Sequence, residues 1–230
     1  MKAMILAAGR GKRMGSLTDE LPKPMLMVAG KPLIGRLIER LVAASFTDLV
    51  INLAWHGEKI RDYFGDGSGW GATIEWSEEG SLPLGTAIGV RRVLPLMGKQ
   101  PFLVVNSDVA GDIDFAALVA ESKRIPTAMA HLLLVDNPDH NPDGDFGLVD
   151  GRLVAGSSER LTYAGCGVFH PSLIQNSDEA QLGALIYAAL AGGETISGNR
   201  HPGWWLDVGT PERLQLAAQR YGGVTMLNAP

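Results

Sequence analysis

The chain has 230 residues, of which 46% are hydrophobic and 20% charged, ordinary values for a folded, water-soluble protein of this length. Its net charge of −5 argues against broad binding to nucleic acid or to an anionic membrane, and no apolar stretch is long enough to span a membrane. The single cysteine, Cys166, excludes an internal disulfide bond and a thiolate zinc cluster, and the first residues lack the cleavage site of a signal peptide, which predicts a cytoplasmic protein.

Strand-like and helix-like patterns alternate along the chain. We expect strands at residues 4–8, 49–54, 72–76, 102–105, 128–135, 168–170 and 204–208, and helices at 33–42, 86–97 and 211–221. Asp150-Gly151 suits the type I′ turn of a hairpin, and Thr210-Pro211 is typical of a helix cap and first helical residue. This order predicts an α/β fold with a Rossmann-like, mostly parallel (mixed) sheet flanked by helices, in one domain of residues 1–230.

The segment of residues 4–26 reads MILAAGRGKRMGSLTDELPKPML and is the most informative part of the chain. An apolar strand enters a loop that contains Gly9, Gly11 and three cations, among them Arg13, and Lys23 follows between two prolines. Glycines let the backbone approach a ligand closely, and clustered cations neutralise phosphate charge. A loop of this kind after a first strand predicts a nucleotide site.

Two common phosphate-binding motifs do not fit this loop. A dinucleotide fingerprint needs a third glycine where Met14 stands, and a P-loop needs a Ser or Thr after the lysine where Arg13 stands. The pattern L-A-A-G-x-G-x-R-M, followed by P-K-P at residues 22–24, instead resembles the sugar-1-phosphate nucleotidyltransferases. The resemblance implies the nucleotide-diphospho-sugar transferase type of fold, with a nucleotide-binding half (about 1–110) and a sugar-binding half (about 111–230).

Two aspartates follow or end predicted strands far apart in the sequence. Asp108 comes after the apolar run 102–105, and Asp207 lies in the string W-L-D-V-G-T. Ligands of an open α/β sheet bind at the carboxyl ends of its strands, so both carboxylates can reach one crevice, where Mg²⁺ would suit them. Either aspartate alone is also a common turn or cap residue. The resemblance implies that both bind the metal, although Ser107 stands where the family usually has glycine.

The resemblance also implies the remaining roles in a transfer of a nucleoside monophosphate from a nucleoside triphosphate to a sugar 1-phosphate. Arg13 would hold the leaving pyrophosphate and Lys23 the incoming sugar phosphate, which makes Arg13, Lys23, Asp108 and Asp207 the expected catalytic residues. The nucleotide would bind to Leu6, Ala7, Ala8, Gly9, Gly11, Gly85 and Thr86, and the sugar to Asn52, Asp145, Gly147 and Gly165.

Several strings indicate the sugar. Residues 50–55, 134–138, 144–148 and 205–210 resemble the bacterial N-acetylmuramate-1-phosphate uridylyltransferases of peptidoglycan recycling, whereas the L-G-T-A string at 84–87 looks more like the glucose- and mannose-phosphate branches. We therefore expect UTP and N-acetylmuramate 1-phosphate as substrates. Mannose-1-phosphate guanylyltransferase and glucose-1-phosphate uridylyl- or thymidylyltransferase activities stay open. We expect no nucleic-acid or membrane partner, and a monomer or a small homo-oligomer.

Structural explanations compete with several of these roles. Asn52 could be an ordinary polar strand end, Thr86 a helix cap, and Glu78 and Glu79 solvated turn residues. The loop at 136–145 could gather His140, Asp143 and Asp145 around a metal, although loops of this composition are usually solvated turns. A catalytically silent nucleotide-sugar sensor and a nucleotide-dependent oxidoreductase are the alternatives from other classes.

Overall fold

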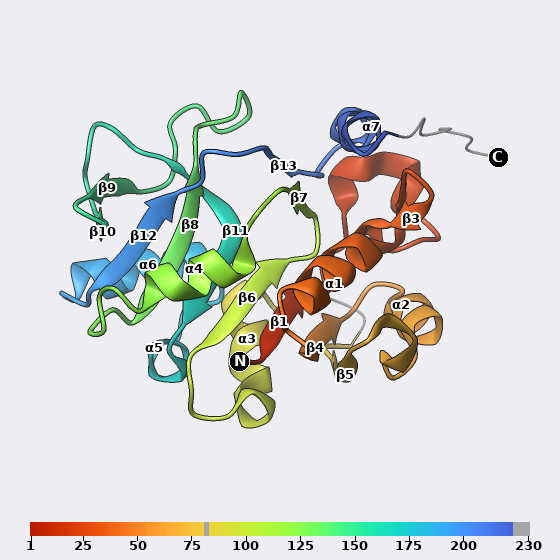
Figure 1. The fold of residues 1–230 in the computed structure, drawn as a ribbon, viewed down its shortest axis with the longest axis horizontal. Helices are drawn as coiled ribbons and strands as arrows, with labels where there is room; N and C mark the ends of the chain where they lie inside the picture. The colour runs from red at the N-terminus through yellow and green to blue at the C-terminus, as the bar shows by residue number, and fades with distance from the viewer. Residues whose placement is uncertain (81–82, 223–230) are drawn as a thin grey trace.

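Nine strands form the central sheet of the computed structural model, which describes residues 1–80 and 83–222 (Figure 1). The strands are β1 (Ala3–Leu6), β2 (Met27–Val28), β3 (Lys31–Pro32), β4 (Asp48–Leu53), β5 (Thr73–Glu78), β6 (Phe102–Asn106), β7 (Val109–Gly111), β8 (Ala130–Val135), β9 (Gly147–Val149), β10 (Arg152–Val154), β11 (Thr162–Phe169), β12 (Ile196–Arg200) and β13 (Trp205–Asp207). The α-helices are α1 (Leu33–Ala43), α2 (Gly57–Phe64), α3 (Thr86–Met97), α4 (Phe115–Ser122), α5 (Pro171–Gln175), α6 (Leu182–Ala191) and α7 (Pro211–Arg220), with 3-10 turns η1 (Lys12–Thr18), η2 (Lys23–Met25) and η3 (Ser68–Trp70).

The sheet is mixed, with the order β5-β4-β1-β6-β11-β8-β12-β10-β9. β5, β4, β1 and β6 run parallel to one another, β11 is antiparallel to both β6 and β8, and β12 returns parallel to β8. The parallel strands are joined by helices, whereas β9 and β10 form a hairpin at the opposite edge. The predicted mostly parallel, mixed sheet flanked by helices is confirmed.

Strand residues alternate between two cores, one on each face of the sheet. In β1, Ala3 and Ile5 belong to the core that also contains residues of α1 and α4, whereas Met4 and Leu6 belong to the core that contains residues of α3, α5 and α6. Figure 1 shows α1 and α4 in front of the sheet. Because the central strands are covered on both faces, they are apolar throughout, as is usual for parallel strands.

The hairpin turn and helices α1, α3 and α7 agree with the sequence analysis, whereas β11 begins six residues before the strand expected at 168–170. Helix α3 has the predicted bounds, and Asp150 and Gly151 have φ angles of 49° and 74°, as a type I′ turn requires. Helices α2, α4, α5 and α6 and strands β7 and β12 were not expected. Helix α6 (LGALIYAALA) is apolar almost all round, so it lacks the contrast between faces on which a periodicity argument depends.

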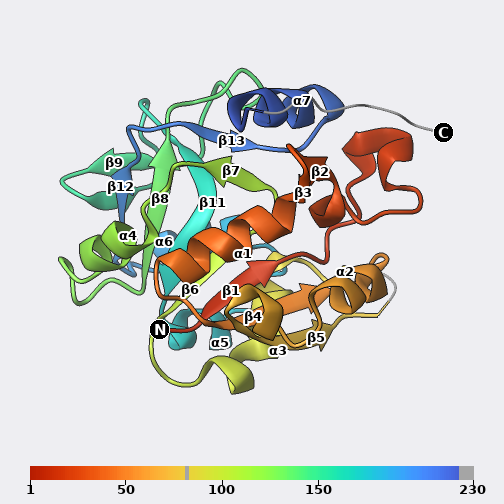
Figure 2. The same ribbon diagram turned by 45° about the vertical axis from the view of Figure 1, so that its right-hand side comes forward.

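A second, two-stranded sheet lies above the main one. Figure 2 shows β13 alongside β7, beneath α7, and the two strands pair antiparallel with Asp207 opposite Val109. A third core, which includes Met14, Val208 and Leu214, fastens α7 to the segment around η1. This arrangement carries the carboxyl-terminal part of the chain back to the loop that follows β1.

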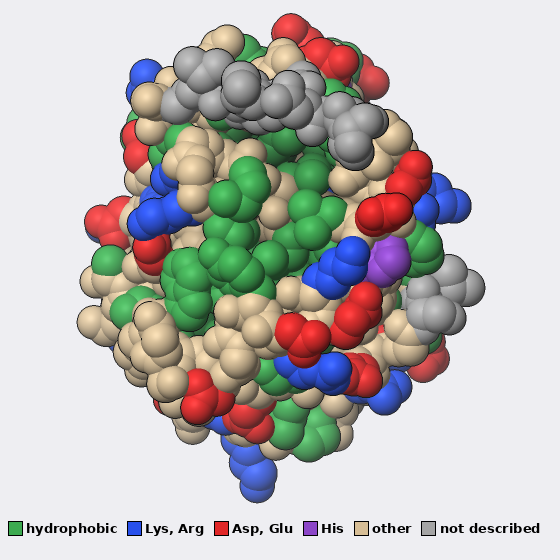
Figure 3. Space-filling view, turned by 90° about the vertical axis from the view of Figure 1, so that its right-hand side faces the viewer, with side chains coloured by type: hydrophobic (Ala, Val, Ile, Leu, Met, Phe, Trp, Pro, Cys, Tyr) green, Lys and Arg blue, Asp and Glu red, His purple; other side chains and the backbone are tan. Residues whose placement is uncertain are grey.

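The described residues contain no helix both long and apolar enough to cross a membrane. On the face shown in Figure 3, acidic and basic side chains are interspersed around a central group of hydrophobic ones, and the described residues there form no continuous basic patch.

Candidate active site

A cavity of about 380 Å³ opens at the carboxyl ends of β1, β4 and β6. This is the edge of a parallel sheet where ligands bind in α/β proteins. Its lining brings together residues from the first glycine loop, from β4 and β6, and from the segment before α3. The lining residues are Leu6, Ala8, Gly9, Gly11, Lys23, Pro24, Asn52, Glu79, Pro83, Leu84, Gly85, Thr86, Asn106, Ser107, Asp108 and Gln181.

The glycine loop is held in one shape by contacts to its own end. Gly11 has φ 68°, and a Cβ there would lie 3.0 Å from Cβ of Lys23, so the position needs glycine. The Arg10 guanidinium stacks over Trp55 at 3.6 Å, and both side chains donate hydrogen bonds to the Thr18 carbonyl. The loop is therefore rigid before any phosphate arrives.

Pairing of β7 with β13 brings the two aspartates together. Asp108 directly precedes β7 and Asp207 ends β13, and the Val208 N–H donates to the Asp108 carbonyl at 2.8 Å. Both side chains are mostly buried, with exposed fractions of 19% and 20%. The carboxylates therefore occupy one small region beside the cavity.

Each carboxylate is neutralised by cations of the chain itself. Lys23 Nζ pairs with Asp108, and Asp207 pairs with Arg213 Nη1 and, at 3.0 Å, with His140 Nε2. Burial raises the pKa of Asp207 above its ordinary value, Arg213 and His140 lower it, and the nearby charge of Asp108 raises it. The cations around Asp207 therefore oppose the effect of burial on the pKa of its carboxyl group.

The donor set fits a hard divalent cation that arrives with phosphate. The described residues contain no group of three or more His, Cys, Asp or Glu side chains placed to hold a metal by themselves. Mg²⁺ is usually bound by one or two carboxylates together with phosphate oxygens and water, and two neighbouring aspartates supply that share. His140 lies on Asp207 rather than in the cluster with Asp143 and Asp145 that the loop sequence suggested.

A buried polar network supports the other side of the cavity. Asn52 Oδ1 accepts from the Ala7 N–H at 2.8 Å, and Asn52 Nδ2 donates to Glu79 Oε1 at 2.7 Å. Glu79 Oε2 in turn accepts from the Leu84 N–H at 3.0 Å, and both side chains are almost fully buried. The role of Glu79 could not be predicted from sequence, because two adjacent glutamates give no sign of which side chain points inward. In the structure Glu78 is the exposed one and pairs with Arg61.

Gly85 and Thr86 lie where the cavity meets α6. Gly85 has φ 112°, and a Cβ there would lie 2.6 Å from the Ala180 carbonyl oxygen, so only glycine fits. Thr86 is the first residue of α3 rather than its cap, and its hydroxyl accepts from the Leu182 N–H at 2.8 Å and donates to Gln181. Gln181 therefore joins the cavity from a distant segment that no sequence pattern marked.

Of the four expected sugar residues, Asn52 lines the cavity and Gly165 lies close to it. A Cβ at Gly165 would lie 2.7 Å from Nδ2 of Asn106, a lining residue. Asp145 and Gly147 are not among the lining residues: Asp145 accepts from the Tyr163 N–H at 2.7 Å, and a Cβ at Gly147 would overlap Ser157. Both positions have structural explanations, and their sugar contacts stay predictions.

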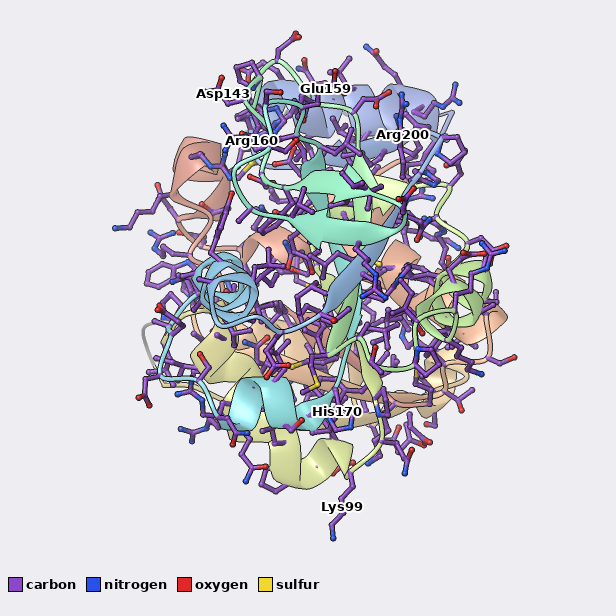
Figure 4. All side chains as sticks on the ribbon, turned by 90° about the vertical axis from the view of Figure 1, so that its left-hand side faces the viewer. Lys99, Asp143, Glu159, Arg160, His170 and Arg200 are labelled. Carbon is purple, nitrogen blue, oxygen red and sulfur yellow. The ribbon has the colours of Figure 1, made fainter. Side chains whose placement is uncertain are left out.

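The loops before and after the β9–β10 hairpin carry exposed charged residues. Figure 4 shows Asp143, Glu159 and Arg160 at one end of the molecule, with His170 toward the other. The Arg160 carbonyl accepts from Asn137, while the described residues offer no partner for its guanidinium. Ala7 and Arg13 are not lining residues either; the Ala7 N–H is bonded to Asn52, and the Arg13 guanidinium lies beside Gly209.

A glycine loop at the end of a parallel strand, clustered cations, and two carboxylates brought together by the antiparallel β7–β13 pair are the features of an α/β enzyme that acts on phosphate esters of nucleotides. The nucleotidyl transferase family model matches residues 2–161, and the chain belongs to this family of enzymes. The prediction of a nucleotidyltransferase is therefore confirmed, and the oxidoreductase alternative is wrong.

Known proteins resemble the chain over almost its whole length. It is 49% identical to the N-acetylmuramate alpha-1-phosphate uridylyltransferase of Neisseria meningitidis, covering 94% of the chain and 96% of that protein. The protein of the same name from Caulobacter vibrioides is 29% identical over 94% of the chain and 95% of its own length. A solved structure from Bacillus anthracis in complex with sucrose has the same fold, with a TM-score of 0.85 at 20% identity, covering 99% of this chain and 98% of that one.

Proposed function

We propose that this protein transfers UMP from UTP to N-acetylmuramate 1-phosphate, giving UDP-N-acetylmuramate and pyrophosphate. The observation that carries this proposal is the 49% identity to the Neisseria meningitidis uridylyltransferase over nearly the full length of both chains. The cavity beside the aspartate pair supports it, because its lining unites the glycine loop, Lys23 and Asp108.

Asp108 and Asp207 would hold Mg²⁺ together with phosphate oxygens of the triphosphate. When bound, the ion neutralises charge at the α-phosphate. The chain's own part is to keep the two carboxylates adjacent, through the β7–β13 pairing, and to balance their charge with Lys23 and Arg213. The assignment to Mg²⁺ rather than another divalent ion rests on the oxygen donors alone.

The reaction is an in-line displacement at phosphorus. An oxygen of the sugar phosphate forms a bond to the α-phosphorus, the bond to the bridging oxygen breaks, and pyrophosphate leaves with that electron pair. No general base is needed, because the attacking phosphate is already ionised at neutral pH. Catalysis is therefore positioning and charge neutralisation by the residues around the cavity.

Lys23 is placed to serve the incoming sugar phosphate. It borders the cavity, its backbone is fixed by flanking prolines at the start of η2, and its ammonium group rests on Asp108. If Mg²⁺ were bound to Asp108, the ion would balance the charge of that carboxylate, and the Lys23 ammonium would be available to pair with the sugar phosphate. Arg13 offers a guanidinium to the leaving pyrophosphate.

The base would lie against the segment 84–86. Gly85 allows the backbone to come close to a ring, and Glu79 holds the neighbouring Leu84 N–H. Asn52 connects this segment to Ala7, so the two sides of the base site move as one unit. We place the reaction in the cytoplasm, where nucleoside triphosphates are available, and expect a monomer or a small homo-oligomer.

Pyrophosphate release measured over a grid of substrates tests the proposal. The grid combines UTP, GTP and dTTP with the 1-phosphates of N-acetylmuramate, mannose and glucose, each with and without Mg²⁺. UTP with N-acetylmuramate 1-phosphate should give a kcat/KM at least tenfold above every other pair and no turnover without a divalent cation. A preference for mannose 1-phosphate with GTP would make the protein a mannose-1-phosphate guanylyltransferase, and a preference for glucose 1-phosphate would make it a glucose-1-phosphate uridylyl- or thymidylyltransferase. Tight nucleotide binding without turnover of any pair would favour a catalytically silent nucleotide-sugar sensor.

A further inference from the structure

Arg213 is a buried cation in the first turn of α7 that no sequence motif singled out. Only 9% of the residue is exposed. Its Nη1 atom donates to Asp207 Oδ1 and lies 2.7 Å from the Nε2 atom of His140. The Nη1 edge of the guanidinium is thus bonded to Asp207, one of the two proposed metal ligands.

The other edge of Arg213 faces the Arg13 guanidinium across Gly209. A Cβ on Gly209 would lie 2.5 Å from Arg213 Nη2 and 3.1 Å from Arg13 Nη2. Both nitrogen atoms therefore lie close to one point above the Gly209 backbone, and a side chain at position 209 would displace them. Arg13 comes from the loop after β1 and Arg213 from α7, so the two meet only in the folded chain.

Two guanidinium groups so close together repel each other unless an anion lies between them. Asp207 neutralises only one of the two, through Arg213 Nη1. Within residues 1–80 and 83–222, no hydrogen-bond partner is found for Arg213 Nη2 or for any nitrogen of the Arg13 guanidinium. The unpaired N–H donors of these two arginines therefore point toward the same place. A phosphate group there could accept two parallel hydrogen bonds from a guanidinium.

We propose that Arg213 and Arg13 together form the site for the two phosphates that leave as pyrophosphate. This inference rests on the proposed nucleotidyl transfer. Arg213 would then contact both the carboxylate proposed to hold the metal and the leaving group, and would couple the position of Asp207 to the presence of pyrophosphate. His140, from the loop after β8, contacts the same Nη1 atom that donates to Asp207 and leaves Nη2 to the phosphates.

Isothermal titration of inorganic pyrophosphate, in the presence of Mg²⁺, tests this site without any turnover. Arg213→Met should weaken pyrophosphate binding at least tenfold, and Arg213→Lys should weaken it about threefold to tenfold, because an ammonium keeps the charge but loses the fork. Arg220→Met is the matched control: Arg220 ends the same helix and stacks on Trp204, and its loss should leave the affinity unchanged.

Separate readouts distinguish phosphate binding from a purely positioning role. Thermal unfolding shows whether each variant folds, and Mn²⁺ binding followed by electron paramagnetic resonance reports on the carboxylate pair. If Arg213→Met weakens Mn²⁺ binding but binds pyrophosphate normally, Arg213 only positions Asp207 and the proposal is overturned. If Arg213→Met does not fold, Arg213→Lys decides, and an unchanged pyrophosphate affinity in that variant also overturns it.

Different results would refute the two-arginine site and the proposed nucleotidyl transfer. A wild-type protein that turns over sugar 1-phosphate while its Arg213 variants keep normal pyrophosphate affinity refutes only the two-arginine site. A wild-type protein that neither binds pyrophosphate nor releases it from any substrate pair refutes both. Product inhibition gives an independent check, since the inhibition constant of pyrophosphate should rise in Arg213→Lys by the same factor as its dissociation constant.

Discussion

The two aspartates of the proposed metal site, Asp108 and Asp207, are each paired with cations of the chain. Lys23 pairs with one carboxylate and Arg213 with the other, so neither buried charge stands alone. A divalent ion would compete with these cations for the carboxylate oxygens, and it would gain phosphate ligands when it arrives with a nucleotide. We therefore expect metal affinity to be far higher in the presence of nucleotide than in its absence.

Replacement of either aspartate by asparagine should abolish Mg²⁺-dependent turnover. Asp108→Asn and Asp207→Asn keep the side-chain shape and remove the charge, so we expect kcat/KM to fall by about 10³ or more, equivalent to about 4 kcal/mol of transition-state stabilisation. Steady-state pyrophosphate release measures this. Asp136→Asn, at an exposed partner of Arg200, should behave as wild type. Near-normal rates in both site variants would refute the metal assignment.

His131 should make the fold sensitive to mild acid. It is buried in β8, with Nδ1 2.8 Å from Ser197 Oγ and Nε2 2.8 Å from Asn199 Oδ1. Burial lowers the pKa of His131 below its ordinary 6.5, although the Asn199 hydrogen bond and the charge of Glu121 oppose the shift. The unfolded chain then binds the proton more readily, so stability is complete above pH 6.5 and falls as the pH drops through and below that value.

Urea unfolding at pH 7.5 and 5.5 measures this sensitivity. The wild-type protein should lose more free energy of unfolding between the two pH values than His131→Gln, which cannot be protonated. An equal loss in both proteins would show that His131 does not titrate differently in the folded and unfolded states.

At the scale of elements, the junction of β13 and α7 carries much of the site. Asp207 ends β13, Gly209 lies between the two arginines, and Thr210 caps α7, where its hydroxyl accepts from the Arg213 N–H. Because β13 ends and α7 begins within a few residues, the carboxylate of Asp207 and the guanidinium of Arg213 lie close together in the sequence and in space. The sequence predicted both the strand and the cap, but the role of Arg213 depends on how α7 is then packed.

Loss of the Thr210 cap should destabilise this junction moderately. Thr210→Ala leaves a backbone N–H of the first turn without its acceptor, and we expect a loss of about 1 kcal/mol in the free energy of unfolding. Thr210→Ser retains the hydroxyl and should stay within about 0.5 kcal/mol of wild type. Chemical denaturation of the three proteins provides the comparison, and equal midpoints for Ala and wild type would mean that the cap contributes nothing.

At the scale of the whole molecule, the site is assembled from segments in both halves of the chain. The glycine loop, Asn52, Glu79 and Asp108 come from the first half, and Gln181, Asp207 and Arg213 from the second. A ligand that bridges them binds only the folded chain, so it must stabilise the fold in proportion to its affinity.

Nucleotide should therefore raise the melting temperature. With Mg²⁺ and UTP at about 100 times its Kd, the expected stabilisation is about 2.7 kcal/mol, or about 5–10 °C for a chain of this length. Differential scanning calorimetry measures the shift. Removal of divalent ions with EDTA should reduce the shift sharply. A shift of equal size with EDTA would mean that nucleotide binds without the metal.

The sequence alone determined the features that depend on neighbours along the chain. The glycine loop, the Asp150-Gly151 turn and the cap at Thr210 need only local backbone geometry, which a few adjacent residues specify. The reaction class came instead from the resemblance to a known family, carried by the L-A-A-G-x-G-x-R-M and P-K-P strings and supported by those around Asp108 and Asp207. Helix α6 could not be predicted in this way, because it is apolar on almost all sides and its sequence shows no alternation of polar and apolar residues at helical spacing.

Only the tertiary structure decided which side chains meet. The β7–β13 pairing puts Asp207 beside Asp108, the inward turn of Glu79 rather than Glu78 ties Asn52 to Leu84, and the packing of α7 sets Arg213 against Asp207 and Arg13. Such contacts depend on strand register and on the burial of apolar surface between distant segments. These are properties of the whole folded chain, and no short stretch of sequence contains them.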